Sequence, residues 1–194
     1  MKQLFIDVET TGVNHWQHST HQISGGLFID GELKEQFDFK VRPHEKGKID
    51  PEALALTNLN LEDLLKYPHR LEVKKELDAI LNKYINKFDK NDKAFFCAYN
   101  AHFDNAFMRA FFKQCGDNYF GSYFWSNNID VMVLAAEYLK DRRAQLPNFK
   151  LMTVAKFLGI EVDEDKAHDG FYDILITKKV YDLITQPPAK NGSN

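Results

Sequence analysis

The order of apolar and polar residues predicts strands in the first part of the chain. Residues 2–8 and 21–29 are rich in apolar side chains, and residues 35–41 alternate between apolar and polar ones. Asp30-Gly31, between the second and third of these segments, is typical of a tight hairpin turn. The apolar run at residues 94–99 predicts a further strand, buried within a sheet.

Helices are expected after the hairpin strands. Apolar residues spaced three or four positions apart predict a helix over residues 70–88. Short helices are expected within 43–68, and longer ones over 104–112, 130–139, 149–158 and from Asp169 past Tyr181. Hairpin strands followed by strand–helix units favour a mixed α/β sheet with flanking helices. One domain is expected over residues 1–185, and the Pro-, Gly- and Ser-containing residues 186–194 are expected to be a disordered tail.

The composition narrows the function classes. Apolar residues make up 44% of the 194 residues, which is enough for a full core, and the net charge of −3 excludes a strongly basic nucleic-acid-binding protein. Cys97 and Cys115 lack zinc-type spacing and are too few for a disulfide framework. The chain shows no signal peptide and no apolar run long enough to span a membrane. We therefore expect a cytoplasmic protein without membrane contact.

Two carboxylates stand together at the end of the first predicted strand. Side chains alternate along a strand, so Asp7 and Glu9 project from the same face. Their repulsion is tolerable at a solvated edge or around a divalent cation. Thr10-Thr11-Gly12 ends the strand and lets the backbone turn close to a ligand.

Two further acids lie in informative places. Asp104, in the segment 100–104, follows a buried strand, and polar ligands of open α/β sheets gather at such corners. If a helix starts at Asp169, then Asp173 lies one turn inside it and His168 lies in the preceding loop. Taken singly, each of these acids could be a solvated carboxylate or a helix cap. For Asp130, the helix cap is the favoured interpretation.

Three motifs in this order resemble the DnaQ-like 3′–5′ exonuclease family of the DEDDh type. They are Asp-x-Glu-Thr-Thr-Gly at 7–12, Asn-Ala-x-Phe-Asp at 100–104 and His-x-x-x-x-Asp at 168–173. The resemblance covers the chain from Leu4 to about Thr177. It implies a ribonuclease H-like fold, a mixed five-stranded sheet with helices on both faces.

The resemblance also implies roles for individual residues. Asp7, Glu9, Asp104 and Asp173 would bind two divalent cations, Mg²⁺ or Mn²⁺, and His168 would be the general base. An imidazole of ordinary pKa predicts a rate that rises through roughly pH 6–8. The substrate would contact the following residues: Thr10, Thr11, Gly12, Leu59, Asn100 and Phe103.

The chain departs from the family pattern at two places. Gly170 stands where relatives often have Ala, which keeps the space open but loosens the helix start. The His-Gly pair common in the middle segment is replaced around residues 57–59. That segment touches the terminal nucleotide in relatives, so the substrate preference is the property these departures affect.

The resemblance implies hydrolysis at the 3′ end of single-stranded DNA with release of nucleoside 5′-monophosphates, as in proofreading or repair. A 3′–5′ exoribonuclease of the same family and a polymerase-accessory binding module are the alternatives. A DNA polymerase is a candidate partner, and the sequence does not indicate an oligomeric state.

Several other residues have open interpretations. His15, His18 and His21 recur every three residues, and a polar loop is favoured over a metal site there. Trp16 could stack on a base or be partly buried in the fold. The cations Arg142, Arg143 and Lys150 could contact phosphates or lie near helix ends for electrostatic reasons, while Lys74-Lys75 and Lys178-Lys179 are expected on solvated helix faces.

Overall fold

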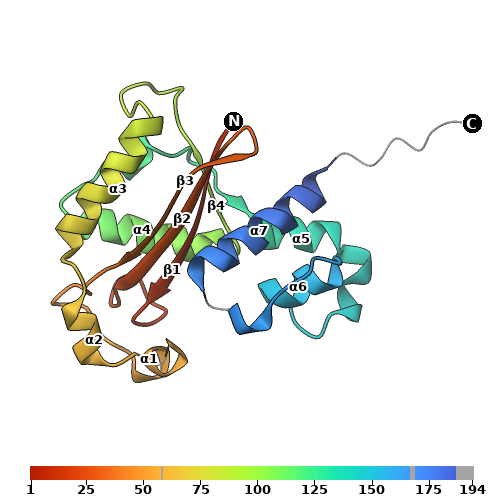
Figure 1. The fold of residues 1–194 in the computed structure, drawn as a ribbon, viewed down its shortest axis with the longest axis horizontal. Coiled ribbons are helices and arrows are strands. Elements are labelled where there is room, and N and C mark those ends of the chain that lie inside the picture. Colours follow the sequence, from red (N-terminus) through yellow and green to blue (C-terminus); the bar gives the residue numbers. More distant parts are fainter. Residues whose placement is uncertain (58, 167–168, 187–194) are drawn as a thin grey trace, which may run out of the picture.

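Five strands form one mixed sheet in the order β3-β2-β1-β4-β5 (Figure 1). The computed structural model describes residues 1–57, 59–166 and 169–186. The strands are β1 (Lys2–Thr10), β2 (Thr20–Ile29), β3 (Glu32–Lys40), β4 (Phe95–Ala98) and β5 (Ile129–Asp130). β1 pairs antiparallel with β2, and β2 with β3, whereas β1, β4 and β5 run parallel. The carboxyl ends of β1 and β4 therefore meet at one edge of the sheet.

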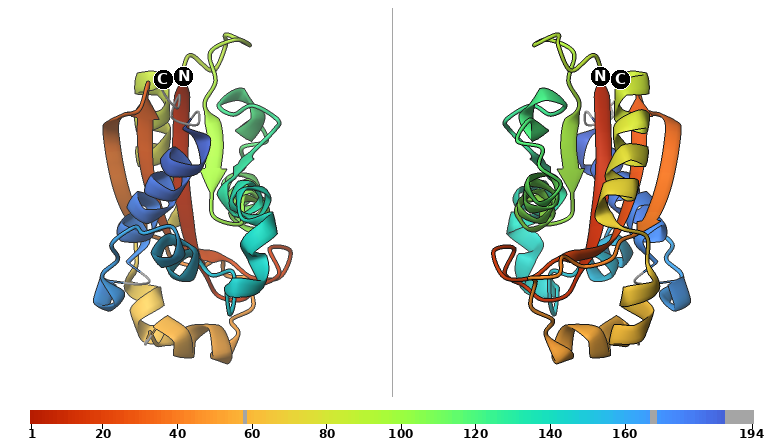
Figure 2. Two further views of the ribbon diagram at one scale, coloured as in Figure 1. Left: turned by 90° about the vertical axis from the view of Figure 1, so that its right-hand side faces the viewer. Right: turned by 90° about the vertical axis from the view of Figure 1, so that its left-hand side faces the viewer.

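Helices cover both faces of this sheet. They are α1 (Pro51–Thr57), α2 (Leu61–Lys66), α3 (Arg70–Tyr84), α4 (Ala101–Gln114), α5 (Val131–Tyr138), α6 (Leu151–Phe157) and α7 (Gly170–Thr185). α3 and α4 pack on one face, and α5, α6 and α7 on the other (Figures 1 and 2). α1 and α2 lie beyond the carboxyl end of β1 (Figure 1). The mixed five-stranded sheet with flanking helices is thus as expected.

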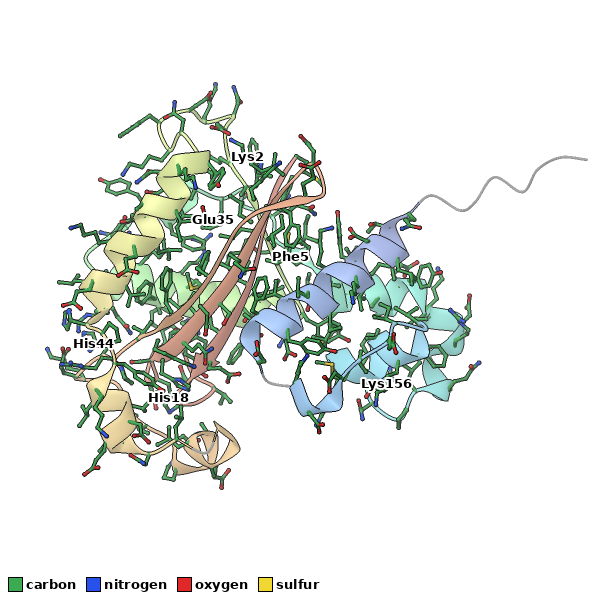
Figure 3. All side chains as sticks on the ribbon, in the orientation of Figure 1. Lys2, Phe5, His18, Glu35, His44 and Lys156 are labelled. Atoms are coloured by element: carbon green, nitrogen blue, oxygen red, sulfur yellow. The ribbon has the colours of Figure 1, made fainter. Side chains whose placement is uncertain are left out.

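Strand β1 supplies side chains to two apolar cores. Leu4, Ile6 and Val8 pack with α3 and α4, whereas Phe5 points to the opposite face, which α7 covers (Figure 3). Because side chains alternate, Asp7 continues the row that starts with Phe5. On the face of β1 that α7 covers, the side chains therefore change from apolar to acidic towards the carboxyl end of the strand.

Some element boundaries differ from the sequence prediction. α4 begins at Ala101, so Asp104 lies in its first turn and is not its N-cap. α3 ends at Tyr84, and Phe88, counted as part of its apolar face, is 88% exposed. Asp130 is an N-cap as favoured, because its side chain accepts from the amides of Met132 and Val133.

The prediction of solvated lysines was wrong for two of them. Lys74 is buried and contacts Asp78 and Asp117 at 2.6 and 2.7 Å. Lys178 is also buried, and its ammonium lies 2.6 Å from an oxygen of Asp182. Asp78 and Asp182 each lie one turn along the same helix as their lysine, and Asp117 follows α4; pairing with these carboxylates makes the burial tolerable. In the described part of the chain, no helix is long and apolar enough to cross a bilayer.

Candidate active site

Carboxylates gather where β1 ends beside the start of α4. Asp7 and Glu9 lie on β1, and Asp104 lies in the first turn of α4. The backbone amide of Val8 donates to Oδ1 of Asp104 at 3.1 Å, which ties the helix to the strand. This single bond joins residues 96 positions apart and holds the Asp104 carboxylate beside the end of β1.

Helix α7 brings a fourth acid to the same place. Asp169 caps the helix by accepting from the amides of Phe171 and Tyr172, so Asp173 falls in its first turn. A Cβ at Gly170 would lie 2.9 Å from Cβ of Ser24 and 3.4 Å from Oδ2 of Asp7. The absence of a side chain at Gly170 therefore lets the start of α7 approach β2 and Asp7 closely.

The carboxylates repel one another strongly. Burial raises the pKa of Asp7 well above its usual value, and the charges of Asp104, Glu9 and Asp173 raise it further. Burial likewise raises the pKa of Asp104 to about 8, against the opposing effect of its hydrogen bond from Val8. Without a cation, Asp104 therefore favours its protonated form at neutral pH.

One contributor to this field was missed by the sequence analysis. Asp38 on β3 also raises the pKa of Asp7, and the strand register places Asp7 opposite Ser24 and Ser24 opposite Asp38. Oδ1 of Asp38 accepts from Oγ of Ser24 at 2.8 Å and from Nε2 of Gln22 at 2.7 Å. The alternation of Phe37, Asp38 and Phe39 indicated the face of the strand, but only the register gives the neighbours.

The donor set suits a hard divalent cation. Carboxylate oxygens are the ligands that Mg²⁺ and Mn²⁺ prefer, and a cation would relieve the repulsion that raises these pKa values. Within residues 1–57, 59–166 and 169–186, no three His, Cys, Asp or Glu side chains are arranged as ligands of one ion. The four acids fit such a cation by their chemistry and by the charge that Asp104, Glu9 and Asp173 exert on Asp7, and their side chains would have to move closer together to bind it.

The loop after β1 is organised by its own hydrogen bonds. Oγ1 of Thr10 donates to the carbonyl of Gly12, and Oγ1 of Thr11 donates to the carbonyl of Lys48. Gly12 has a φ of +152°, and a Cβ there would lie 2.6 Å from the His18 ring. Glycine is therefore required for the turn, and the side chain of Thr11 is engaged within the fold.

The other three residues expected to contact substrate border the same edge. Asn100, between β4 and α4, has a φ of +71°, and its side chain does not cap the helix. Such a conformation in a non-glycine residue costs about 1 kcal/mol or more and is often found at functional sites. Phe103 is half-buried with its ring 4.8 Å from that of Phe107, and Leu59 lies half-buried between α1 and α2.

His168, expected as the general base, lies outside the described residues. The described residues that flank this gap are the η3 turn (Glu164–Lys166) and Asp169, the cap of α7. The role of His168 stays a prediction.

The three regularly spaced histidines have separate surroundings. Nδ1 of His18 accepts from the amide of Asn14, and His18 lies near the carboxyl end of strand β1 (Figure 3). His21 is completely buried in β2, and His15 packs beside Trp16. They form no joint metal site among the described residues.

The exposure of Trp16 and the contacts of Arg142 and Arg143 bear on the alternatives left open for these residues. Trp16 is 78% exposed, so its burial in the fold was the wrong alternative. Arg142 lies 5.3 Å above the ring of Phe157, and Arg143 lies 4.8 Å above that of Phe149. These stacked arginines have local partners, and their contact with phosphates stays a prediction.

Comparison with known proteins identifies the family of the chain. The family model RNase_T, described as an exonuclease, matches residues 4–181. Ribonuclease T of Yersinia enterocolitica is 29% identical over 191 residues, which cover 91% of this chain and 80% of that protein. The PolC-type DNA polymerase III of Mycoplasmopsis pulmonis is 23% identical, with coverage of 97% and 12%.

Solved structures show the same fold. E. coli Exonuclease I in complex with a dT13 oligonucleotide superimposes with a TM-score of 0.74 at 19% sequence identity, covering 94% of this chain and 40% of that one. The chain thus spans well under half of Exonuclease I and about an eighth of the PolC polymerase. The family match over most of its length shows that the chain belongs to the RNase_T exonucleases, DnaQ-like 3′–5′ exonucleases that hydrolyse phosphodiester bonds and generally depend on divalent metal ions.

Proposed function

We propose that this chain removes nucleotides from the 3′ end of single-stranded DNA and releases nucleoside 5′-monophosphates. The observation that carries the proposal is the gathering of Asp7, Glu9, Asp104 and Asp173 around the end of β1, where the last three raise the pKa of Asp7. Repulsion among acids held close together in a partly buried site is destabilising, and it is expected where cations complete a site.

Four side chains would hold the cations in this proposal. Asp7 and Glu9 come from one face of β1, Asp104 is steadied by the Val8 amide, and Asp173 is carried in by α7. Two divalent cations bound there would lower the pKa of the attacking water and stabilise charge on the phosphoryl oxygens. The rates of degradation with Mg²⁺ and with Mn²⁺ distinguish which of the two ions is preferred.

His168 would take the proton of the attacking water. An imidazole with an ordinary pKa is suited to this role near neutral pH. The proposal predicts that His168→Ala slows hydrolysis by about 100-fold or more, and that the wild-type rate rises through roughly pH 6–8. An unchanged rate in His168→Ala would remove this residue from the mechanism.

The remaining site residues would position the strand. Gly12 lets the backbone after β1 come close to the terminal nucleotide, with Thr10 and Thr11 holding that turn. Asn100 and Phe103 border the opposite side, at the start of α4. Leu59 would approach the terminal base from between α1 and α2.

RNA is the second candidate substrate. The fold similarity to Exonuclease I bound to dT13 supports DNA, whereas the similarity to Ribonuclease T supports RNA. The similarity to a PolC-type polymerase supports a polymerase as a candidate partner.

A degradation assay tests the function and chooses the substrate. Single-stranded DNA and RNA of matched sequence, labelled at the 5′ end, are followed in time with Mg²⁺ or Mn²⁺. We expect a ladder that shortens from the 3′ end, absent in Asp7→Asn and retained in Asp141→Asn, an exposed acid outside the site. Failure of the wild type to degrade either strand while still binding it would favour an accessory binding module.

A further inference from the structure

A hollow of about 590 Å³ lies between the loop that follows β1 and helix α4. One wall is the loop that follows β1, with His15 and Trp16, and the other is the outer face of α4. Its volume is in the range of ordinary ligand sites. Figure 2 shows this loop extending from the end of β1 on the side of the sheet where α4 lies.

The spacing of residues on α4 makes this surface concave. Ala106 and Ala110 are one turn apart and give the helix a shallow apolar floor. Arg109 and Lys113, also one turn apart, stand along that floor and are exposed. The helix thus places two cations next to alanine side chains that are too small to fill the hollow.

The loop presents an aromatic surface to the same space. Trp16 is 78% exposed, and its ring centroid lies 4.7 Å from that of His15. His15 in turn packs edge-on against Phe107 at 6.1 Å. The backbone of this loop is held, because the amide of Trp16 donates to Oδ1 of Asn14 at 2.9 Å. The indole therefore packs against His15 and is otherwise largely exposed to solvent.

The charge of the hollow is positive. Nε of Arg109 donates to Oδ1 of Asn105 at 2.7 Å, and the guanidinium lies 4.6 Å above the Phe120 ring. These contacts fix the guanidinium plane and leave its terminal nitrogens without an ion pair to any described residue. Lys113 likewise has no carboxylate partner in the described part of the chain, and no acid lines the hollow.

Such a lining matches one nucleotide of a single strand. An aromatic ring supplies a stacking surface for any base, and neighbouring cations supply contacts for its phosphate. We propose that this hollow binds a nucleotide on the 5′ side of the one being removed, with its base on Trp16 and its phosphate near Arg109 and Lys113.

The position of the hollow along the strand follows from connectivity. α4 carries both Asp104 and the floor of the hollow, and β1 carries Asp7 and leads directly into the Trp16 loop. In a 3′–5′ exonuclease the terminal nucleotide lies at the carboxylates, so strand beyond it can only be 5′ of the cleaved bond. This inference rests on the proposed function.

Two substrates separate the hollow from the chemistry. A single-stranded DNA of about ten nucleotides reaches the hollow, whereas the p-nitrophenyl ester of thymidine 5′-monophosphate reaches only the carboxylates. We expect Trp16→Ala to raise the KM for the oligonucleotide about 5- to 100-fold, because stacking on an aromatic ring is worth that much. Its rate with the small ester should stay at the wild-type value.

The cationic contact has its own readout. Lys113→Gln should weaken oligonucleotide binding and reduce the salt dependence of binding by about one counterion. Binding is measured by fluorescence anisotropy with Ca²⁺ in place of Mg²⁺. The matched control is Lys179→Gln, an exposed lysine on α7, which should leave both quantities unchanged.

The outcomes distinguish the two proposals. If Trp16→Ala and Lys113→Gln bind and degrade the oligonucleotide like the wild type, the hollow is not a strand site, whatever the activity on the ester. If the wild type cleaves nothing but Trp16→Ala still loses oligonucleotide binding, the proposed function fails and the hollow remains a strand-binding site. Both side chains are exposed, so their replacement should leave the free energy of unfolding nearly unchanged.

Discussion

Gly170 lets the start of helix α7 approach strand β2 closely, and replacing it with alanine tests whether that contact positions Asp173. Alanine favours a helix over glycine by about 1 kcal/mol, so a helix position without neighbours would gain stability. At Gly170, however, the new Cβ would lie 2.9 Å from Cβ of Ser24 and closer still to its hydroxyl. Carbon atoms pack at about 3.5–4.0 Å, so a relaxation of more than half an ångström is needed.

The neighbours decide how this overlap is relieved. Oγ of Ser24 could rotate away only by giving up its 2.8 Å hydrogen bond to Asp38. Cβ of Ser24 is fixed to the central part of β2 and cannot rotate, so the start of α7 has to move. Overpacking of this kind costs about 1–3 kcal/mol, which exceeds the gain in helix propensity. We expect Gly170→Ala to lower the free energy of unfolding by about 1 kcal/mol.

The effect on activity should be larger than the effect on stability. Asp173 lies less than one turn after Gly170, so the shift of the helix start moves this carboxylate directly. A displacement of about 1 Å can cost about 100-fold in rate. Unfolding in urea and the initial rate of oligonucleotide hydrolysis measure the two effects separately.

Two further variants make this reasoning refutable. Gly121→Ala is the matched control, because a Cβ at Gly121 meets nothing within 4 Å. The double variant Gly170→Ala with Ser24→Gly removes the clashing atoms and should recover most of the lost rate. A Gly170→Ala protein that is more stable than the wild type and fully active would refute the steric argument.

Three other predictions concern the ionisable groups. Asp7→Asn should abolish hydrolysis and yet raise the free energy of unfolding without divalent cations by about 1–2 kcal/mol at neutral pH, because folding raises the pKa of Asp7; a gain that persists below pH ~4 would contradict this origin. The affinity for Mg²⁺ should rise between about pH 6 and 8, because Asp104, with a pKa of about 8, must lose its proton before it binds a cation; calorimetry in two buffers should detect the released proton, and a pH-independent affinity would contradict the assignment. Burial lowers the pKa of His21 from 6.5 to about 4, so protonation of His21 should lower the free energy of unfolding by about 3 kcal/mol as the pH falls from 6.5 to 4, with no effect above pH 6.5. His21→Gln should remove this part of the pH dependence, measured by urea unfolding across that range. An unchanged pH dependence in the variant would contradict the assignment.

The sequence by itself determined the features that depend on local geometry. The two-residue period of a strand places Asp7 and Glu9 on one face, and the structure has both on β1. The cap of α5 follows from Asp130, and the start of α7 follows from Asp169, because a cap bonds to amides only two or three residues away. Even the mixed sheet followed from the order of hairpin strands and strand–helix units.

Local patterns were less reliable where a segment ends. The apolar spacing continued to Phe88, although α3 stops at Tyr84 and Phe88 is in solvent. The two-residue strand β5 is too short to have a pattern of its own. Its existence depends on pairing with β4, which the chain reaches only after folding.

The tertiary structure alone decided which groups face one another across the sheet and between helices. Asp38 joins the acidic cluster through the register of three strands, Lys74 is buried because Asp117 comes to it from α4's far end, and Gly170 matters because Ser24 lies beneath it. The hollow beside Trp16 also needs two distant segments to form. Contacts between residues far apart in the chain depend on how helices pack and on how several strands align, and the period of a single helix or strand does not specify these by itself.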